Sequence, residues 1–443
     1  MEHDMKQQLI GALLASAAMT APALAQTEVQ WWHAMGGELG TKLEQIAAGF
    51  NETQKDFKIV PVYKGSYPET LTAAIAAFRA KEQPAIVQVF EVGTGTMMAA
   101  KGAVYPVYKL MADQGKTFDK ADYLAPVVGY YSDPEGNILS LPFNSSTPIM
   151  YYNKDVFAKA GLDPEVAPKT WAEVESFSKK IVDSGAARCG FTSGWISWVQ
   201  LENLSALHDA PYGTKENGFA GPDTAFTFNG DVQVKHWGNL KKWADAGLFQ
   251  YGGPVGGNDA PPKFYTQECA IYMNSSASRA GVINNAKDFK VGFAPLPYYD
   301  DVIAEPKNSI IGGATLWVLN GRPAAEYKGV AAFFDYLSKA EVQADWHQFT
   351  GYLPITHAAY DLGVSTGYYA KTPGADVAIK QITRGTPSAH SKGLRFGNLT
   401  QVRDVIDSEF EALLASKKTA KEALDSAVAR GNTILRDFEA ANK

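Results

Sequence analysis

Residues 142–164 read Pro-Phe-Asn-Ser-Ser-Thr-Pro-Ile-Met-Tyr-Tyr-Asn-Lys-Asp-Val-Phe-Ala-Lys-Ala-Gly-Leu-Asp-Pro, and residues 168–174 read Pro-Lys-Thr-Trp-Ala-Glu-Val. The polar residues Asn144 to Ser146 predict a turn, and the apolar run from Ile149 to Tyr152 predicts a buried strand. A short helix then stops at Gly-Leu-Asp-Pro, and Thr170 opens the next helix. We interpret this segment as a crossover between two lobes.

Strands and helices alternate on the N-terminal side of this crossover. Apolar runs predict strands at 29–33, 57–63 and 85–90, and helical periodicity follows each of them, at 38–50, 67–81 and from 95 onward. This order predicts an α/β fold with a mostly parallel sheet and helices on both of its faces.

The C-terminal side repeats this alternation. Capping boxes at 170–173 and 419–422 each predict a helix start. Strands are expected at 268–273, 289–294 and 309–318. The last of these is interrupted by Gly312 and Gly313, which suit a hinge or a close approach of the backbone.

The chain has 443 residues, which is too long for one hydrophobic core, so two lobes are expected. We predict three crossings between the lobes, near 143–147, 308–313 and 353–358. Lobe one then comprises 26–143 plus 312–355. Lobe two comprises 147–308 plus 358–443.

Residues 1–25 have the features of a secretory signal peptide. Lys6 supplies the positive charge, an apolar run covers 9–19, and Ala23-Leu24-Ala25 is a cleavage site that leaves Gln26 as the first mature residue. Met5 is an alternative start to Met1. A membrane anchor is the competing interpretation, but the run is shorter than the ~20 residues of a span. We therefore expect a periplasmic protein.

Composition excludes some partners and leaves the cysteines open. The formal charge is −6 with 20% charged residues, and such a mildly acidic chain has no basic footprint for nucleic acid. Cys189 and Cys269 are compatible with a disulfide in an exported protein, and equally with two buried thiols on neighbouring strands.

The motifs of common enzymes are missing from the sequence. No two histidines have zinc-ligand spacing, and there is no phosphate-binding P-loop or nucleophile elbow, so we expect neither a metal nor a cofactor. Glu38, Glu91 and Glu202 could still pair in three dimensions as the acids of a glycosidase. A carbohydrate-processing enzyme is therefore one alternative function.

Polar and aromatic residues instead gather at the ends of the predicted strands. Tyr67, Glu91, Ser146 and Ser275 follow strands, and Gly313 interrupts one. Ligands of open α/β sheets bind outside the carboxyl ends of the strands, so these residues are candidates for a binding site. Five tryptophans could line the same cleft or pack in the core: Trp31, Trp32, Trp171, Trp195 and Trp198. Arg403, near a helix start, could meet an anion or face solvent.

The run Tyr-Tyr-Asn-Lys-Asp…Ala-Gly-Leu…Pro-Lys-Thr-Trp resembles the interdomain segment of periplasmic solute-binding proteins of the maltose-binding type. Members of this family deliver small molecules to ABC importers. Further motifs resemble, more specifically, the members that bind glycerol-3-phosphate: these lie at 32–40, 62–67, 88–98, 310–314 and 346–355, and together the matches span nearly the whole chain after residue 25.

The resemblance implies a two-lobed periplasmic-binding-protein fold whose lobes are joined by a hinge. It also implies a monomer without catalytic activity, which captures glycerol-3-phosphate and glycerophosphodiesters such as glycerophosphocholine for the membrane subunits of an importer. A sugar-binding protein of the same fold is the main alternative.

The resemblance also implies which residues contact the ligand. The family's contacts fall here on Tyr67, Glu91, Ser146, Ser275, Gly313, Tyr352 and Arg403, and Trp171 matches a tryptophan near the ligand. Arginine, hydroxyl groups and backbone amides suit a phosphate, and Glu91 suits the glycerol hydroxyls. Pro68 departs from the family, which often has an acidic residue there.

Overall fold

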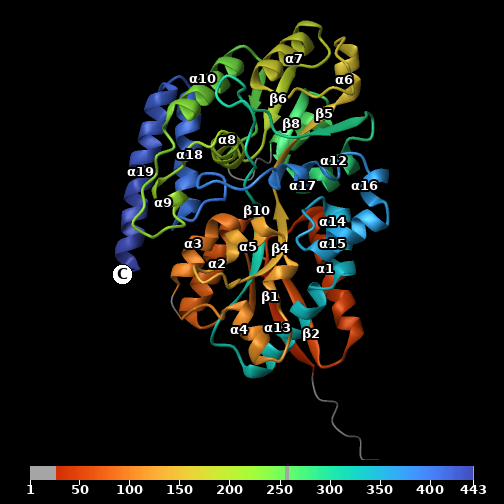
Figure 1. Cartoon of the computed structure of the whole chain (residues 1–443), viewed down its shortest axis with the longest axis vertical. Helices are drawn as coiled ribbons and strands as arrows, with labels where there is room; N and C mark the ends of the chain where they lie inside the picture. The colour runs from red at the N-terminus through yellow and green to blue at the C-terminus, as the bar shows by residue number, and fades with distance from the viewer. Residues whose placement is uncertain (1–25, 101, 255–258, 443) are drawn as a thin grey trace, which may run out of the picture.

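The structure is a computed structural model that describes residues 26–100, 102–254 and 259–442. The expected signal peptide lies outside these residues. Figure 1 shows an elongated molecule in which two α/β parts are stacked along the long axis. Each part contains one five-stranded sheet, so the predicted two-lobed α/β fold is confirmed.

The first sheet is mixed. Its order is β2-β1-β3-β10-β4, in which β1 pairs in parallel with β2 and β3, while β10 is antiparallel to β3 and β4. The strands are β1 Thr27–His33, β2 Phe57–Tyr63, β3 Ile86–Phe90, β10 Gly312–Val318 and β4 Leu141–Ser146.

The second sheet has the same arrangement. Its order is β7-β6-β8-β5-β9, in which β6 is parallel to β7 and β8, and β5 is antiparallel to β8 and β9. The strands are β7 Phe249–Tyr251, β6 Cys189–Ser193, β8 Cys269–Ser275, β5 Pro148–Asn153 and β9 Val291–Ala294.

The chain passes between the sheets where the opening segment predicts a crossover. β4 belongs to the first sheet and β5, one residue later, to the second; the chain returns from β9 to β10. The predicted turn at Asn144 to Ser146 is wrong, because these residues form the end of β4 and pair with Gly312 to Ala314 of β10. The lobe boundaries given above remain our proposal.

Helices cover both sheets. Those before the crossover are α1 Gly37–Thr53, α2 Tyr67–Ala80, α3 Thr94–Ala99, α4 Val107–Asp113 and α5 Ala125–Tyr131. Those between β5 and β9 are α6 Lys154–Lys159, α7 Trp171–Asp183, α8 Asn203–Leu207, α9 Thr214–Asn217, α10 Asp231–Asp245, α11 Ala260–Tyr265 and α12 Arg279–Asn285. Those after β10 are α13 Ala324–Leu337, α14 Ala340–Thr350, α15 His357–Ser365, α16 Tyr368–Lys371, α17 Val377–Ile382, α18 Leu399–Leu414 and α19 Ala420–Ala441.

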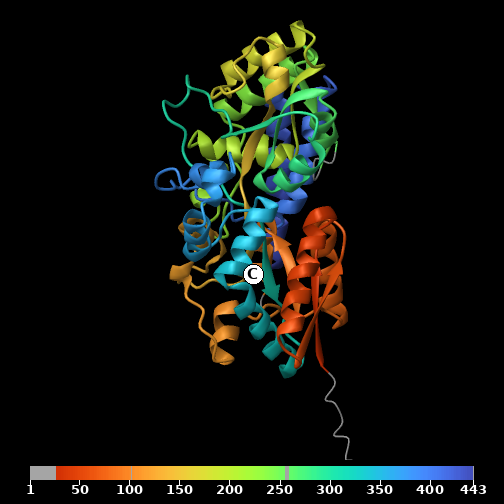
Figure 2. The ribbon, with the colours of Figure 1, turned by 90° about the vertical axis from the view of Figure 1, so that its right-hand side faces the viewer.

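Segments distant in sequence complete each part. In Figure 2 the segment from β10 through α14 (cyan) lies beside the N-terminal strands and helices (red), and β10 pairs with β3 and β4. The C-terminal helices α18 and α19 (blue in Figure 1) run along one side and pack on α10. The two predicted capping boxes, at Thr170 and Thr419, open α7 and α19.

A disulfide joins Cys189 of β6 to Cys269 of β8. The two residues are direct partners in the parallel register, with their Cα atoms 4.6 Å apart. This settles the alternative that the sequence left open: the cysteines are neighbours on adjacent strands, and they are bridged.

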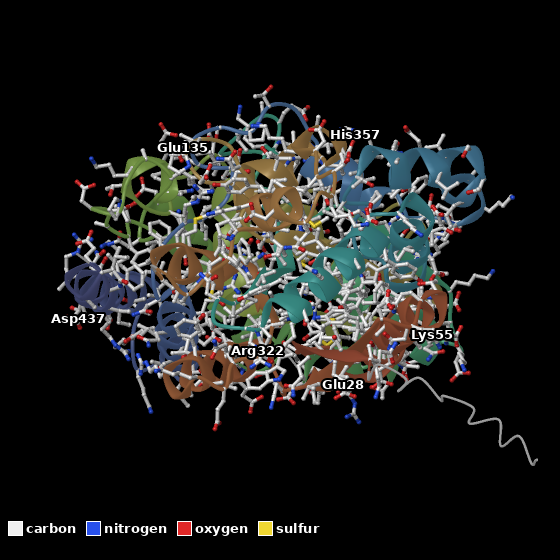
Figure 3. All side chains as sticks on the ribbon, turned by 90° about the horizontal axis from the view of Figure 1, so that it is seen from below. Glu28, Lys55, Glu135, Arg322, His357 and Asp437 are labelled. Atoms are coloured by element: carbon white, nitrogen blue, oxygen red, sulfur yellow. A yellow bond between two sulfur atoms is a disulfide. The ribbon has the colours of Figure 1, made fainter. Side chains whose placement is uncertain are left out.

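Charged side chains cover the outside of the molecule. Figure 3 shows Glu28, Lys55, Glu135 and Asp437 at the outside of the molecule, seen from below. Among the residues that the structure describes, no helix has the length and apolar character needed to cross a bilayer.

Candidate functional site

A cavity of about 570 Å³ lies between the two sheets and receives residues from both. Its wall on the first side comes from the segments after β1, β2 and β3, and on the second side from those after β6 and β8. The carboxyl ends of the parallel strands of both sheets therefore meet at one space, as expected for ligand sites of open α/β sheets.

Seven of the eight predicted site residues line this cavity: Tyr67, Glu91, Ser146, Ser275, Gly313, Tyr352 and Arg403. They come from six strands and helices and from the loop after α14, and Tyr67 and Arg403 are more than three hundred residues apart in the sequence. Their contact with a ligand remains a prediction, but the structure brings them together around one cavity.

Trp171 does not line the cavity. Its ring stacks on Trp243 with centroids 5.6 Å apart and contacts His236 and Tyr299, inside the part of the molecule that holds the second sheet. It is the first residue of α7, whose buried face is core. We therefore correct its predicted place: Trp171 is a core residue, and the tryptophans of the cavity wall are Trp195 and Trp198.

Arg403 lies at the centre of a buried ionic cluster. Its Nε and Nη2 atoms donate to the two carboxylate oxygens of Glu202 at 2.8 and 2.7 Å, and Nη2 also donates to Glu91 at 2.7 Å. All three side chains are at most 7% exposed. The alternative that Arg403 is a solvated surface residue is therefore wrong.

Burial and the oppositely charged partner have opposing effects on the pKa of Glu91 and on that of Arg403. Burial raises the pKa of Glu91, and the charge of Glu202 raises it further, whereas Arg403 lowers it. The neighbouring carboxylates hold the pKa of Arg403 above its usual value against the effect of burial. The guanidinium is therefore a fixed positive charge in the wall of the cavity.

A tyrosine-amide network forms the wall next to Glu91. Asn144 donates to the hydroxyl of Tyr67 at 2.8 Å, and Gln88 donates to the side-chain oxygen of Asn144 at 2.8 Å. The ring of Tyr67 stacks on Phe90, with centroids 5.2 Å apart. Burial keeps the pKa of Tyr67 and Tyr352 above the ordinary value, so both hydroxyls stay protonated and can donate to a ligand.

Small residues also line the cavity, Gly313 from the first sheet and Ser275 from the second. Gly313 has φ of +91°, and a Cβ atom there would lie 1.9 Å from the carbonyl oxygen of Asn144. Only glycine fits such a position. Ser275 ends β8, and its hydroxyl accepts from the backbone amide of Ala277 at 3.1 Å. At these two positions the cavity wall thus presents a hydroxyl and backbone atoms rather than large side chains.

Sequence reasoning missed the role of Glu202. It lies on a short π-helix, Trp198–Glu202, that follows β6, and single turns of π-helix are frequent at functional sites. Trp195, just before this turn, has φ of +49°, an uncommon value for a bulky residue. Glu202 and Arg403 are about two hundred residues apart in the sequence, and spacing in a sequence cannot reveal a pair at such a separation.

The arrangement does not suit the glycosidase alternative. Glu91 and Glu202 bind the same guanidinium, and Glu202 does not line the cavity. Glu38, at the cavity wall, accepts a hydrogen bond from Asn284 at 2.6 Å. In the described residues no cluster of three His, Cys, Asp or Glu side chains could hold a metal ion.

Comparisons with known proteins agree with the resemblance in the sequence. Residues 45–376 match the family model of bacterial extracellular solute-binding proteins. The sn-glycerol-3-phosphate-binding periplasmic protein UgpB of Salmonella typhimurium is 49% identical over 441 residues, covering 99% of both chains. The protein of the same name from Pectobacterium atrosepticum is 50% identical over 434 residues, covering 98% of this chain and 96% of that one.

Solved structures share the fold. UgpB from Mycobacterium tuberculosis in complex with glycerophosphocholine matches with a TM-score of 0.78 at 20% identity, covering 94% of this chain and 100% of that one. The GacH receptor of Streptomyces glaucescens matches with a TM-score of 0.75 at 18% identity, covering 93% and 99%. With its periplasmic relatives this chain is itself a periplasmic protein, and it belongs to the family of bacterial extracellular solute-binding proteins.

Proposed function

We propose that this protein captures glycerol-3-phosphate, and glycerophosphodiesters such as glycerophosphocholine, in the periplasm and delivers them to an ABC importer. The observation that carries the proposal is the buried guanidinium of Arg403 in the wall of the cavity between the two sheets. A guanidinium in a cavity wall presents charge-assisted hydrogen-bond donors whose geometry suits an anionic phosphate.

The rest of the wall supports a phosphate ester rather than a phosphate ion alone. Glu91 offers acceptors for hydroxyl groups of a glycerol, and Tyr67 and Tyr352 offer both hydroxyl donors and ring surfaces. The names of the curated relatives at about half identity agree with this chemistry. A cleft for neutral sugar needs no buried arginine, so the site supports the sugar-binding alternative less well.

The protein acts as a carrier rather than an enzyme in this proposal, and it works as a monomer without nucleic acid. The relatives are named as binding proteins, and both carboxylates of the cluster are engaged by Arg403. A carrier returns its ligand unchanged, so glycerophosphocholine recovered after prolonged incubation should be intact.

Calorimetric titration of the protein without residues 1–25 tests the proposal. We expect saturable heat with one site per chain for glycerol-3-phosphate, and none for maltose, which has no charge to pair with Arg403. Inorganic phosphate is the matched control, because it carries the charge without the glycerol and should bind more weakly. Binding of maltose without any phosphate ester would favour the sugar-binding alternative.

A further inference from the structure

Glu202 accepts two hydrogen bonds from Arg403, whereas Glu91, which lines the cavity, accepts one. Glu202 itself does not line the cavity. Its side chain is 1% exposed, and both of its oxygens are engaged by Arg403. The hydrogen bonds of the described residues occupy Nε and Nη2 of the guanidinium and leave Nη1, although Arg403 itself lines the cavity.

We infer that Glu202 is a positioning residue: it fixes the guanidinium of Arg403 by one edge and leaves Nη1 to meet the phosphate of the ligand. This inference rests on the proposed function. A bidentate carboxylate pair fixes the plane of a guanidinium as well as its position, because two parallel hydrogen bonds allow no rotation. The ligand would then meet an arginine that is already oriented.

The placement of the two carboxylates gives them different tasks. Glu202 follows β6 and Arg403 lies on α18, which packs on α10 and α19, so both belong to the part of the molecule that holds the second sheet. Glu91 follows β3 of the first sheet. Glu202 can therefore hold Arg403 without any contribution from the first sheet, whereas the hydrogen bond to Glu91 joins the two sides at the cavity wall.

Charge alone predicts the opposite effect, so the sign of a mutational effect separates the two explanations. Glu202 places a negative charge next to an anionic ligand, and Coulomb repulsion by itself would weaken binding. Removing that charge should strengthen binding if Glu202 only repels. It should weaken binding if Glu202 orients Arg403, because the freed guanidinium would turn toward Glu91.

The experiment compares calorimetric titrations of glycerol-3-phosphate into the wild-type protein and three variants. Glu202→Gln keeps the shape and removes the charge, and we expect a loss of affinity of about tenfold or more. Glu202→Asp keeps the charge but is one methylene too short for the bidentate contact, and we expect a loss of roughly threefold to tenfold.

Glu409→Gln is the matched control. Glu409 is a buried glutamate on α18, the helix of Arg403, and it pairs with Lys418 and Arg430 away from the cavity. Its substitution should lower the melting temperature without changing the affinity for the ligand by more than about twofold. It thereby separates loss of stability from loss of orientation.

The pH dependence of the affinity gives a second readout. Glycerophosphocholine is the ligand for this measurement, because its phosphodiester carries one negative charge at every pH of the titration. An anion beside Glu91 favours its protonated form, so wild-type affinity should rise as the pH falls. In Glu202→Gln one of the causes that raise the pKa of Glu91 is absent, and the rise should shift to lower pH. The groups that face Glu91 from other elements are Arg403, Glu202 and the tyrosines Tyr67, Tyr130, Tyr131 and Tyr352, and burial raises the pKa of all four tyrosines.

Unchanged or tighter binding of glycerol-3-phosphate by Glu202→Gln would overturn the inference and leave the proposed function intact. If that variant does not fold, Glu202→Asp decides, and wild-type affinity in the Asp variant overturns the inference. A wild-type protein that binds no phosphate ester would overturn the proposed function and this inference with it.

Discussion

The surroundings of Arg403 determine whether this arginine is a surface residue or part of a ligand site. Arginine beside a helix start is equally compatible with a solvated surface or a ligand site, and only its burial between Glu91 and Glu202 distinguishes them. The three side chains carry one positive and two negative formal charges. Removing one member of such a cluster lowers the stability of the fold, because it leaves a buried charge without its opposite charge.

Arg403→Ala should therefore affect folding as well as ligand binding. Without the guanidinium, two buried carboxylates face each other, and we expect a loss of about 3–5 kcal/mol in the free energy of unfolding near neutral pH. Chemical denaturation measures the loss. Arg430→Ala is the control, because Arg430 is half-exposed beside Glu409 and should cost at most about 1 kcal/mol.

The loss in Arg403→Ala should also depend on pH. Arg403 lowers the pKa of Glu91 against burial, so its removal raises the folded-state pKa further above the unfolded value. Such a carboxyl binds more protons in the folded state, and stability falls as pH rises from the unfolded pKa through the folded one. The deficit should therefore grow as the pH rises above the unfolded pKa of a glutamate. A deficit that does not change with pH would mean that Glu91 does not titrate.

The predictable part of the site was its list of proposed ligand contacts, which the family resemblance implies. Seven of the eight line the cavity, and their contact with a ligand remains a prediction. Their supporting contacts were not predictable. Glu202 pairs with a residue two hundred positions away, and a buried tryptophan in a core looks the same in sequence as one in a cleft. Trp171 was misplaced for the second reason.

Elements were predictable where hydrophobic periodicity is strong. The strands at 57–63 and 85–90 and the capped helices after Thr170 and Thr419 follow directly from spacing and capping chemistry. The end of β4 was mistaken for a turn because Asn144 to Ser146 are polar. Their polar groups are buried, and the side chain of Asn144 is hydrogen-bonded to Gln88 and Tyr67. Partners from distant segments thus allow polar residues to form a strand.

Trp171→Ala tests the corrected place of that residue at the start of α7. Removal of a buried indole that contacts Trp243 and His236 should cost about 3–5 kcal/mol in the free energy of unfolding. Affinities for glycerol-3-phosphate and glycerophosphocholine should change equally or not at all. Trp32→Ala is the control at a partly exposed tryptophan and should cost less. A selective loss of glycerophosphocholine would return Trp171 to the ligand site.

At the scale of the whole molecule, hydrogen bonds between the two sides hold them together around the cavity. Glu91 of the first side binds Arg403 of the second, Asn284 donates to Glu38 at the wall, and the backbone of Asn398 donates to Thr96 at 3.1 Å. A ligand that fills the cavity adds contacts to both sides at once. Binding and the association of the two sides are therefore coupled, because the ligand stabilises only the arrangement in which both walls reach it.

The central claim is that a phosphate ester occupies the cavity between the two sheets with its phosphate on Arg403. The most direct measurement is a crystal structure of the protein grown with glycerol-3-phosphate. The account predicts a phosphate oxygen within about 3.2 Å of a nitrogen of Arg403, and the glycerol hydroxyls toward Glu91. A phosphate bound outside the cavity, or a glycerol end placed at Arg403, would contradict it.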